Sequence, residues 1–376
     1  MKHSAWATAA LAVSGIVVLA ACGSSKSSAP SAGATSSSAA AGSSSSAATT
    51  AKFVGCMVSD TGGVDDRSFN AAAWGGMQAA QAANSNISVK FSQSTSPSDY
   101  TPIINTFVSQ KCNIIVTLGF AMGDATKAAA KANASQKFAI VDNVTPGANV
   151  NSLVFNTVQD AFLGGYLAAG MTKTGKVATF GGQEFPTVTI YMDGYWDGVQ
   201  YYNQKHGTHV QVIGWDEKTQ KGSFTGDFTN QTKGQTLTQT FISEGADIIF
   251  PVAGNVGLGA AKAVQQADAS AGSQKVNMEW VDLDGCVSAA TYCKYFITSV
   301  LKGETLAVKT AVLAAASGSF KGGNYVGTLA NGGVSLAPFH DWDSKVSASL
   351  KSELQQISTG IQNGSIQTPT KSPVSL

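Results

Sequence analysis

The sequence predicts an α/β protein made of two similar halves, and three observations indicate this. Continuous apolar runs bounded by turn residues recur along the chain and alternate with helically patterned segments, which is typical of parallel strands buried on both faces. One strand, turn and helix unit is partly repeated in the second half. Finally, a chain of 376 residues retains roughly 320 beyond its N-terminal segments, enough for two domains of ordinary size.

Residues 1–21 are predicted to be an export signal. Lys2 is followed by an apolar run from Ala5 to Ala21, and the run ends in Leu-Ala-Ala-Cys22. This ending resembles the bacterial lipobox, in which Cys22 would carry the lipid. We therefore expect an exported protein that is lipid-anchored to the outer face of the bacterial cytoplasmic membrane. The alternative is an ordinary secreted protein with a stray cysteine.

Residues 22–51 are predicted to be a flexible tether. Beyond Cys22 they are nearly all Ser, Ala, Gly and Thr, with Lys26 as the one charge, and such a composition cannot offset the entropy of ordering. No later apolar run approaches the roughly 20 residues of a spanning helix. Without residues 1–21, which contain Lys2, the chain has 23 basic and 23 acidic residues. This balance argues against nucleic acid or an anionic membrane surface as a partner.

The predicted strands follow in order. Their ranges are Phe53–Val58, Asn113–Leu118, Phe138–Val141, Lys176–Phe180, Val210–Ile213, Asp247–Val252 and Asn277–Val281.

The internal repeat places two aspartates at equivalent positions. The segment NIIVTLGFAMGD at 113–124 resembles DIIFPVAGNVGL at 247–258, and each precedes an Ala-rich helical stretch. Each unit is then followed by a strand ending in aspartate, Asp142 in the first half and Asp282 in the second. Ligands of open parallel sheets bind outside the carboxyl ends of the strands. Both aspartates are thus candidate cleft residues, although each could also cap a turn.

Four cysteines besides Cys22 fit an oxidising compartment. They can form two disulfides in three ways, and we expect the arrangement with Cys56–Cys112 and Cys286–Cys293. Their spacings do not suit a zinc site, and we expect neither a metal nor a cofactor.

The segment VSDTGGVDDRSFN at 58–70, followed by AAAWGGM, resembles the opening signature of the basic membrane protein family. This family includes the purine nucleoside receptor lipoproteins, which are substrate-binding components of ABC transporters. The resemblance continues through FAIVD at 138–142, EGADIIFPVAG at 244–254, VDLD at 281–284 and TSVLK at 298–302. It implies the type I periplasmic-binding-protein fold, with two Rossmann-like lobes joined by three crossovers.

Matched motif by motif, the resemblance implies a set of ligand residues. These are Asp60, Phe69, Asn70, Asp142, Phe228, Gly254, Asp282 and Lys302. Phe224 competes with Phe228, because it lies one helical turn earlier. We expect lobe 1 to contain 53–158 and 303–322, and lobe 2 to contain 159–302 and 323–372. The crossovers are expected near 156–161, 299–303 and 322–327, which places Lys302 at a hinge.

These residue types suit a nucleoside. Phe69 and Phe228 could stack on the two faces of a base. Asn70 and Asp142 could hydrogen-bond its edge, while Asp282 and Lys302 form a pair that binds the ribose hydroxyls. We therefore predict a monomeric binding protein that passes a nucleoside, in the first place a purine nucleoside, to an ABC transporter permease. Asp65, Asp66 and Ser68 are expected to favour the helix N-terminus instead.

Two alternatives stay open. A sugar-binding or sensory lipoprotein of the same fold would use aromatic platforms, for which Trp196 and Trp215 are available. A nucleoside hydrolase would use an aspartate cluster such as Asp60 to Asp66, which resembles the pattern DTDPG(I/V)DD. Gly62 replaces the second aspartate of that pattern, which weakens a calcium site, and we assign no catalytic residue.

Overall fold

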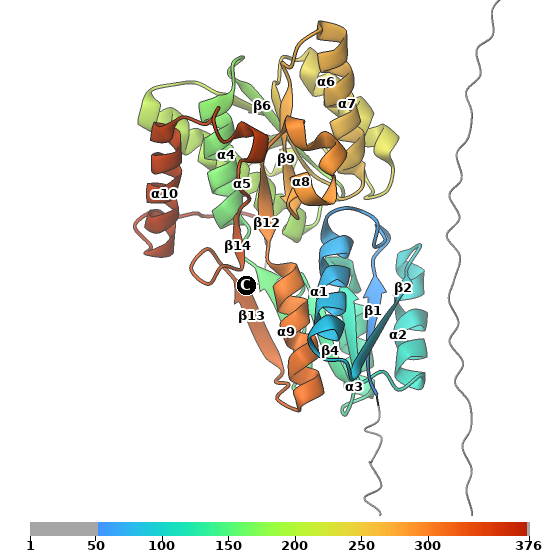
Figure 1. Ribbon diagram of the computed structural model, residues 1–376. Coiled ribbons are helices and arrows are strands. Elements are labelled where there is room, and N and C mark those ends of the chain that lie inside the picture. The colour runs from blue at the N-terminus through green and yellow to red at the C-terminus, as the bar shows by residue number, and fades with distance from the viewer. Residues whose placement is uncertain (1–51, 374–376) are drawn as a thin grey trace, which may run out of the picture. The chain divides into compact units, whose positions relative to one another are not determined.

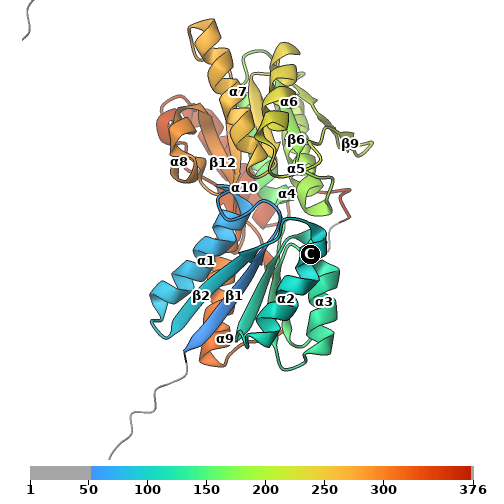
Figure 2. The same cartoon turned by 90° about the vertical axis from the view of Figure 1, so that its right-hand side faces the viewer.

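The computed structural model describes residues 52–373, and these form two α/β lobes around two six-stranded sheets. Figures 1 and 2 show one lobe, with α1, α2, α3 and α9, below the other. The expected signal segment, the tether and Cys22 lie outside the described residues. No helix within 52–373 combines the length and the apolar character needed to cross a membrane.

The first sheet has the strand order β13-β5-β4-β3-β1-β2, with every neighbouring pair parallel. Its strands are β1 (Phe53–Ser59), β2 (Ile87–Gln93), β3 (Ile114–Leu118), β4 (Lys137–Val141), β5 (Val150–Phe155) and β13 (Gly323–Gly327). The helices of this lobe are α1 (Phe69–Ala83), α2 (Tyr100–Ser109), α3 (Gly123–Ala132) and α9 (Glu304–Ser317), with 3-10 turns η1 (Pro97–Asp99) and η2 (Phe120–Met122). Met77 of α1 and Val308 of α9 share one apolar cluster, whereas Ile104 of α2 and Ala129 of α3 belong to another, so helices cover both faces.

The second sheet has the order β14-β12-β11-β10-β6-β7, in which β14 pairs antiparallel and the others parallel. Its strands are β6 (Lys176–Gly181), β7 (Gln211–Ile213), β10 (Ile248–Val252), β11 (Asn277–Asp282), β12 (Phe296–Lys302) and β14 (Val334–Leu336); β8 (Trp215–Asp216) and β9 (Lys221–Gly222) form a small separate ribbon. The helices are α4 (Val158–Met171), α5 (Pro186–His206), α6 (Gln231–Ser243), α7 (Val256–Ala271), α8 (Gly285–Ser288) and α10 (Ala348–Gln362), with η3 (Ala290–Tyr295) and η4 (His340–Trp342).

The helices α4 and α5 pack unusually closely because glycines lie at their contact. A Cβ on Gly165 would lie 1.9 Å from the carbonyl oxygen of Tyr195, and one on Gly198 would lie 2.0 Å from that of Phe162. Since real side chains do not tolerate such distances, these positions require glycine. The tight pair forms one face of lobe 2 together with α10.

The chain crosses between the sheets three times, which establishes the predicted fold class. It leaves the first sheet after β5, returns after β12 and leaves again after β13. One predicted boundary is wrong: β13, residues 323–327, was expected in lobe 2 but pairs with β5 from Asn151 to Phe155. The third crossover therefore follows Gly327 and ends where β14 begins at Val334.

Both expected cysteine pairs form disulfides. Cys56 of β1 is bonded to Cys112, which follows α2, and their Cα atoms are 5.9 Å apart. Cys286 of α8 is bonded to Cys293 of η3 with a Cα separation of 4.4 Å. The first bond links a central strand of lobe 1 to a flanking segment, and the second closes a short surface loop.

Candidate ligand-binding site

A cavity lies between the carboxyl ends of the strands of the two lobes. It contains about 850 Å³ of empty space, part of which is open to solvent. All eight predicted ligand residues line it: Asp60, Phe69, Asn70, Asp142, Phe228, Gly254, Asp282 and Lys302. The other lining residues are Thr61, Asp66, Pro97, Tyr100, Leu118, Gly119, Phe120, Ala121, Gln183, Phe185, Thr187, Val188, Tyr191, Val252 and Ala253. The structure therefore brings together residues that are up to 242 positions apart, from Asp60 to Lys302.

Asp142 and Asp282 occupy equivalent positions in the two lobes, as the internal repeat predicts. Asp142 directly follows β4, and Asp282 is the last residue of β11. Both have left-handed backbone conformations, with φ of 63° and 66°, which is unusual for residues with a side chain and is often found at functional sites. This shared turn directs both carboxylates toward the cavity.

Lys302 joins the two aspartates. Its Nζ lies 2.8 Å from Oδ2 of Asp142 and 3.6 Å from Oδ1 of Asp282, and all three side chains are buried. Burial alone would lower the pKa of Lys302, but the surrounding carboxylates outweigh burial and raise it, so the ammonium stays charged. The expected pair of Lys302 with Asp282 is present, but Asp142 is the closer partner of the ammonium. The ammonium also lies 4.7 Å from the ring centroid of Phe69.

Asn70 lines the cavity and also hydrogen-bonds to Asp60 and Asp66. Its Nδ2 donates to Oδ1 of Asp60 (2.7 Å) and Oδ2 of Asp66 (2.9 Å), while its Oδ1 accepts from the backbone of Asp60. Asn70 therefore supports the two carboxylates, and its direct hydrogen bond to a ligand stays a prediction. The Asn70 amide and the backbone N–H of Gly62 both donate to Oδ1 of Asp60, which leaves its Oδ2 for a ligand. Burial raises the pKa of Asp60 to about 6.

The aromatic wall of the cavity is larger than the sequence predicts. Phe228 lines the cavity, whereas Phe224 does not and packs edge-on against Trp215 with ring centroids 6.0 Å apart. This placement favours Phe228 over Phe224. Phe185 lies between Phe228 and Phe120, with ring centroids 6.2 and 5.7 Å away. Phe120 and Phe185 follow the carboxyl ends of β3 and β6. Phe120 lies within the repeated segment at 113–124, which was the available signal for it.

Tyr191 is a further cavity residue that the sequence does not reveal. It lies inside the long helix α5, is buried, and donates from its hydroxyl to Oδ1 of Asp282 at 2.8 Å. A tyrosine within a helix gives no pattern that distinguishes it from a core residue. Its hydrogen bond fixes the orientation of Asp282.

The tryptophans that support a sugar site lie elsewhere. Trp215 is buried with its Nε1 donating to Asp193, and Trp196 lines a shallow surface hollow beside His209. Neither lines the interlobe cavity. The tryptophan argument for a pyranose platform therefore fails in this structure.

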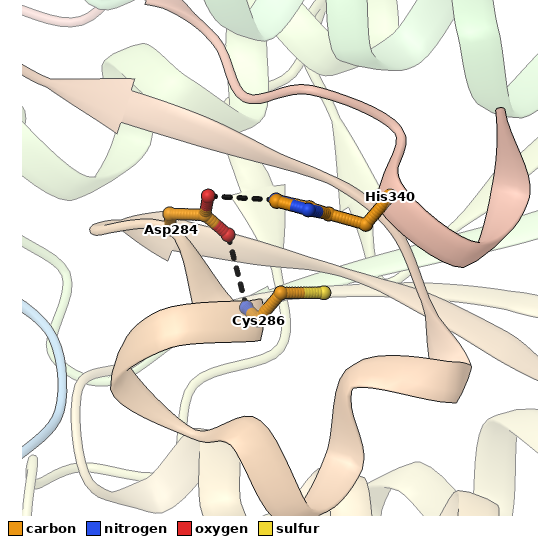
Figure 3. A group of neighbouring side chains, drawn as sticks. All are labelled: Asp284, Cys286 and His340. Atoms are coloured by element: carbon orange, nitrogen blue, oxygen red, sulfur yellow. Dashed lines mark hydrogen bonds and ion pairs between the residues drawn. The ribbon is translucent and has the colours of Figure 1, made fainter.

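The aspartate cluster at 60–66 is not arranged as a metal site. Asp65 is exposed, and Asp66 uses both carboxylate oxygens to accept backbone amides of the first turn of α1. Figure 3 shows a separate group, Asp284, Cys286 and His340, whose ligand atoms lie close together. Cys286 is disulfide-bonded there and cannot act as a thiolate, and His340 pairs with Asp284 at 2.7 Å. We interpret this group as a surface hydrogen bond between His340 and Asp284 beside a disulfide.

Comparison with known proteins matches the geometry. Residues 53–372 match the model of a protein family described as PnrA-like ABC transporter substrate-binding proteins. The chain is 31% identical over 329 residues to the ABC transporter nucleoside-binding protein BmpA of Lactococcus lactis, covering 84% of this chain and 88% of that protein. It is also 31% identical to the CD4+ T-cell-stimulating antigen of Listeria monocytogenes, over 85% and 88% of the two chains. Among solved structures, a solute-binding protein of an ABC transporter system from Aeropyrum pernix superposes with a TM-score of 0.76 at 25% identity, over 84% and 94% of the chains.

Proposed function

Because this chain belongs to the PnrA-like family of ABC transporter substrate-binding proteins, we propose that its interlobe cavity captures a nucleoside, in the first place a purine nucleoside, for import. The family consists of binding components and not of enzymes. The observation that carries the proposal is the meeting of aromatic side chains and carboxylates from both lobes in one cavity. A relative at 31% identity that is named for nucleoside binding supports the same ligand class.

The proposed binding mode uses both kinds of side chain. Phe228, backed by Phe185, and Phe69 offer apolar faces to a planar base, a contact worth roughly 0.5–1.5 kcal/mol beyond burial. Asp60 and Asp282 are acceptors for hydroxyl or amino donors. Gly254 has a left-handed φ of 54°, which residues with a side chain rarely adopt, and this conformation favours glycine there.

The proposed cellular setting follows from the N-terminal segments and the family. We infer a monomer held to the membrane by a lipid on Cys22, with residues 22–51 as a tether. Ligand bound to one lobe would recruit the other by hinge closure at the three crossovers. The closed form would then deliver the nucleoside to an ABC transporter permease.

A thermal-shift screen tests the ligand class. Adenosine, guanosine, inosine, cytidine, uridine, free bases and monosaccharides are each added to the chain from Gly23 onward. A ligand at about 100 times its Kd stabilises the folded state by about 2.7 kcal/mol, so purine nucleosides should raise Tm by several degrees. Stabilisation by monosaccharides and by no nucleoside would replace the nucleoside proposal with a sugar-binding one.

Replacing Asp282 with alanine should weaken nucleoside binding by more than about 1.5 kcal/mol, the value of a charge-assisted hydrogen bond. The carboxylate lines the cavity and is held in place by Tyr191. Isothermal titration calorimetry measures the change. An affinity equal to that of the unmodified protein would show that Asp282 does not contact the ligand.

Nucleoside affinity should fall when the pH drops below 6. Burial raises the pKa of Asp60 to about 6, and an ionised Oδ2 is the better acceptor, so one required ionisation weakens binding about tenfold between pH 7 and pH 5. Asp60 affects stability in the opposite direction. Its folded-state pKa is raised, so its contribution to stability is full below pH 3.8 and is lost as the pH rises through about 6.

Titration calorimetry from pH 5 to 8 provides the measurement. Asp60→Asn should bind more weakly at pH 7 and lose this part of the pH dependence. An unchanged pH profile in that variant would show that another group is responsible.

A further inference from the structure

The segment before α1 contacts the second lobe at two points. The hydroxyl of Ser68 donates to Oδ2 of Asp282 at 2.6 Å, and it also lies 3.3 Å from the carbonyl oxygen of Val281. Next to it, Nε1 of Trp280 donates to the carbonyl oxygen of Arg67 at 3.0 Å. Figures 1 and 2 show the N-terminal end of α1 facing the upper lobe. Both bonds therefore bridge the lobes.

These contacts are buried and preorganised. Ser68 and Trp280 have no exposed surface. Asp66 accepts the backbone amides of Ser68, Asn70 and Ala71 at 2.8–3.0 Å, which stabilises the start of α1. The Ser68 hydroxyl makes no cap bond to α1, contrary to the expectation from sequence, and is free to donate to lobe 2. Arg67 has φ of 61°, a strained conformation that presents its carbonyl oxygen to Trp280.

We propose that Ser68 and Trp280 form an interlobe latch, a positioning contact that couples closure of the lobes to the orientation of Asp282. Arg67, Ser68 and Trp280 do not line the cavity, so the latch acts through Asp282 and not on the ligand. Asp282 receives Tyr191 from its own lobe on Oδ1 and Ser68 from the other lobe on Oδ2. Only the second of these bonds breaks when the lobes separate.

Lys302 is a different kind of contact. It ends β12 directly before a crossover, so its bond to Asp142 lies at the hinge, where opening displaces groups least. The latch joins α1 to the end of β11 and must break on opening. The latch therefore sets how long a closed complex lasts, a role that rests on the proposed interlobe binding.

Dissociation kinetics distinguish a latch from a ligand contact. Ser68→Ala should raise the dissociation rate constant of adenosine, guanosine or inosine by about tenfold, equal to about 1.4 kcal/mol, and leave the association rate constant within about twofold. Trp280→Phe should act in the same direction. The matched control is Ser152→Ala, which removes a buried hydroxyl whose bonds to Thr145 stay within lobe 1. The control should leave both rate constants unchanged.

A second readout needs no nucleoside. Acrylamide quenching assigned to Trp280, obtained by subtracting the Trp280→Phe signal, should increase in Ser68→Ala and stay unchanged in Ser152→Ala. Unchanged quenching overturns the latch. Increased quenching without faster dissociation also overturns it, because the contact would then not position Asp282. If the unmodified protein binds none of the three nucleosides, the proposed function fails, and the quenching result alone decides whether the lobes are latched.

Discussion

Replacing Lys302 with methionine is expected to abolish nucleoside binding and to lower the free energy of unfolding by about 3–5 kcal/mol, the cost of breaking a buried ion pair from one side. The substitution keeps an apolar stem of similar length but leaves Asp142 and Asp282 without their shared cation. Glu304, two residues later, is also buried and has no hydrogen-bond partner among the described residues. Removing Lys302 therefore leaves several carboxyl groups in a desolvated hinge.

The pH dependence of the free energy of unfolding identifies the cause of the lost stability. Without the ammonium, desolvation would raise the pKa of Asp142 further above its ordinary value. Groups whose folded-state pKa is raised stabilise the protein at low pH and lose that contribution as the pH rises. Chemical denaturation at pH 4.5 and pH 7.5 should thus show a smaller defect in the acidic buffer. A defect of equal size at both values would point to lost packing instead.

Lys351→Met is the matched control for the lysine substitution. Lys351 pairs with Asp343 at 2.7 Å, but on the surface, where the aspartate side chain is 67% exposed. Such pairs contribute about 0–1 kcal/mol. The control should therefore bind nucleosides normally and change stability little.

The sequence predicts most of the fold because the central strands are buried on both faces. All seven predicted strands are present, as β1, β3, β4, β6, β7, β10 and β11. Seven strands of the described residues were not predicted. Among them, β2 lies at a sheet edge with several exposed residues, β5 carries Asn151 and Ser152 within its run, and β12 carries Thr298 and Ser299. These strands lack a continuous apolar run, so the pattern does not mark them. The assignment of β13 to the wrong lobe has a related cause. Its partner β5 lies far away in the sequence, and pairing between distant strands leaves no local pattern of residues.

The residues of the candidate site could be predicted from motifs, but the contacts between these residues could not. All eight residues that the motifs indicate line the cavity, and the repeat alone indicates Asp142 and Asp282. Which of these side chains contact one another is determined by the tertiary structure. Lys302 is nearer to Asp142 than to Asp282, Asn70 supports Asp60, and Tyr191 reaches Asp282 from the interior of a helix. Sequence spacing contains no information on these distances.

Removing the Cys56–Cys112 disulfide should cost about 4 kcal/mol of stability, compared with about 2.5 kcal/mol for Cys286–Cys293. The two bonds join residues 56 and 7 positions apart, and a longer closed loop restricts the unfolded chain more. Cys56 and Cys112 are also buried in the core of lobe 1 beside Ile104 and Ile115, so the loss of packing adds to the first value. The double alanine variants of each pair, compared by guanidinium denaturation, measure the two effects separately.

The order of the two losses tests the pairing as well as its energetics. A reducing agent breaks both bonds in the unmodified protein but only the remaining bond in each double variant, so it should destabilise the double variants less. The variant that lacks all four cysteines should show no response. If removing Cys286 and Cys293 costs as much as removing Cys56 and Cys112, loop length is not the controlling quantity.

Because Asp60 follows β1, which carries Cys56, loss of the longer-range bond should also weaken nucleoside binding, whereas loss of the surface bond should leave it nearly unchanged. A protein whose site depends on a disulfide in this way requires an oxidising compartment to function, which agrees with the predicted export.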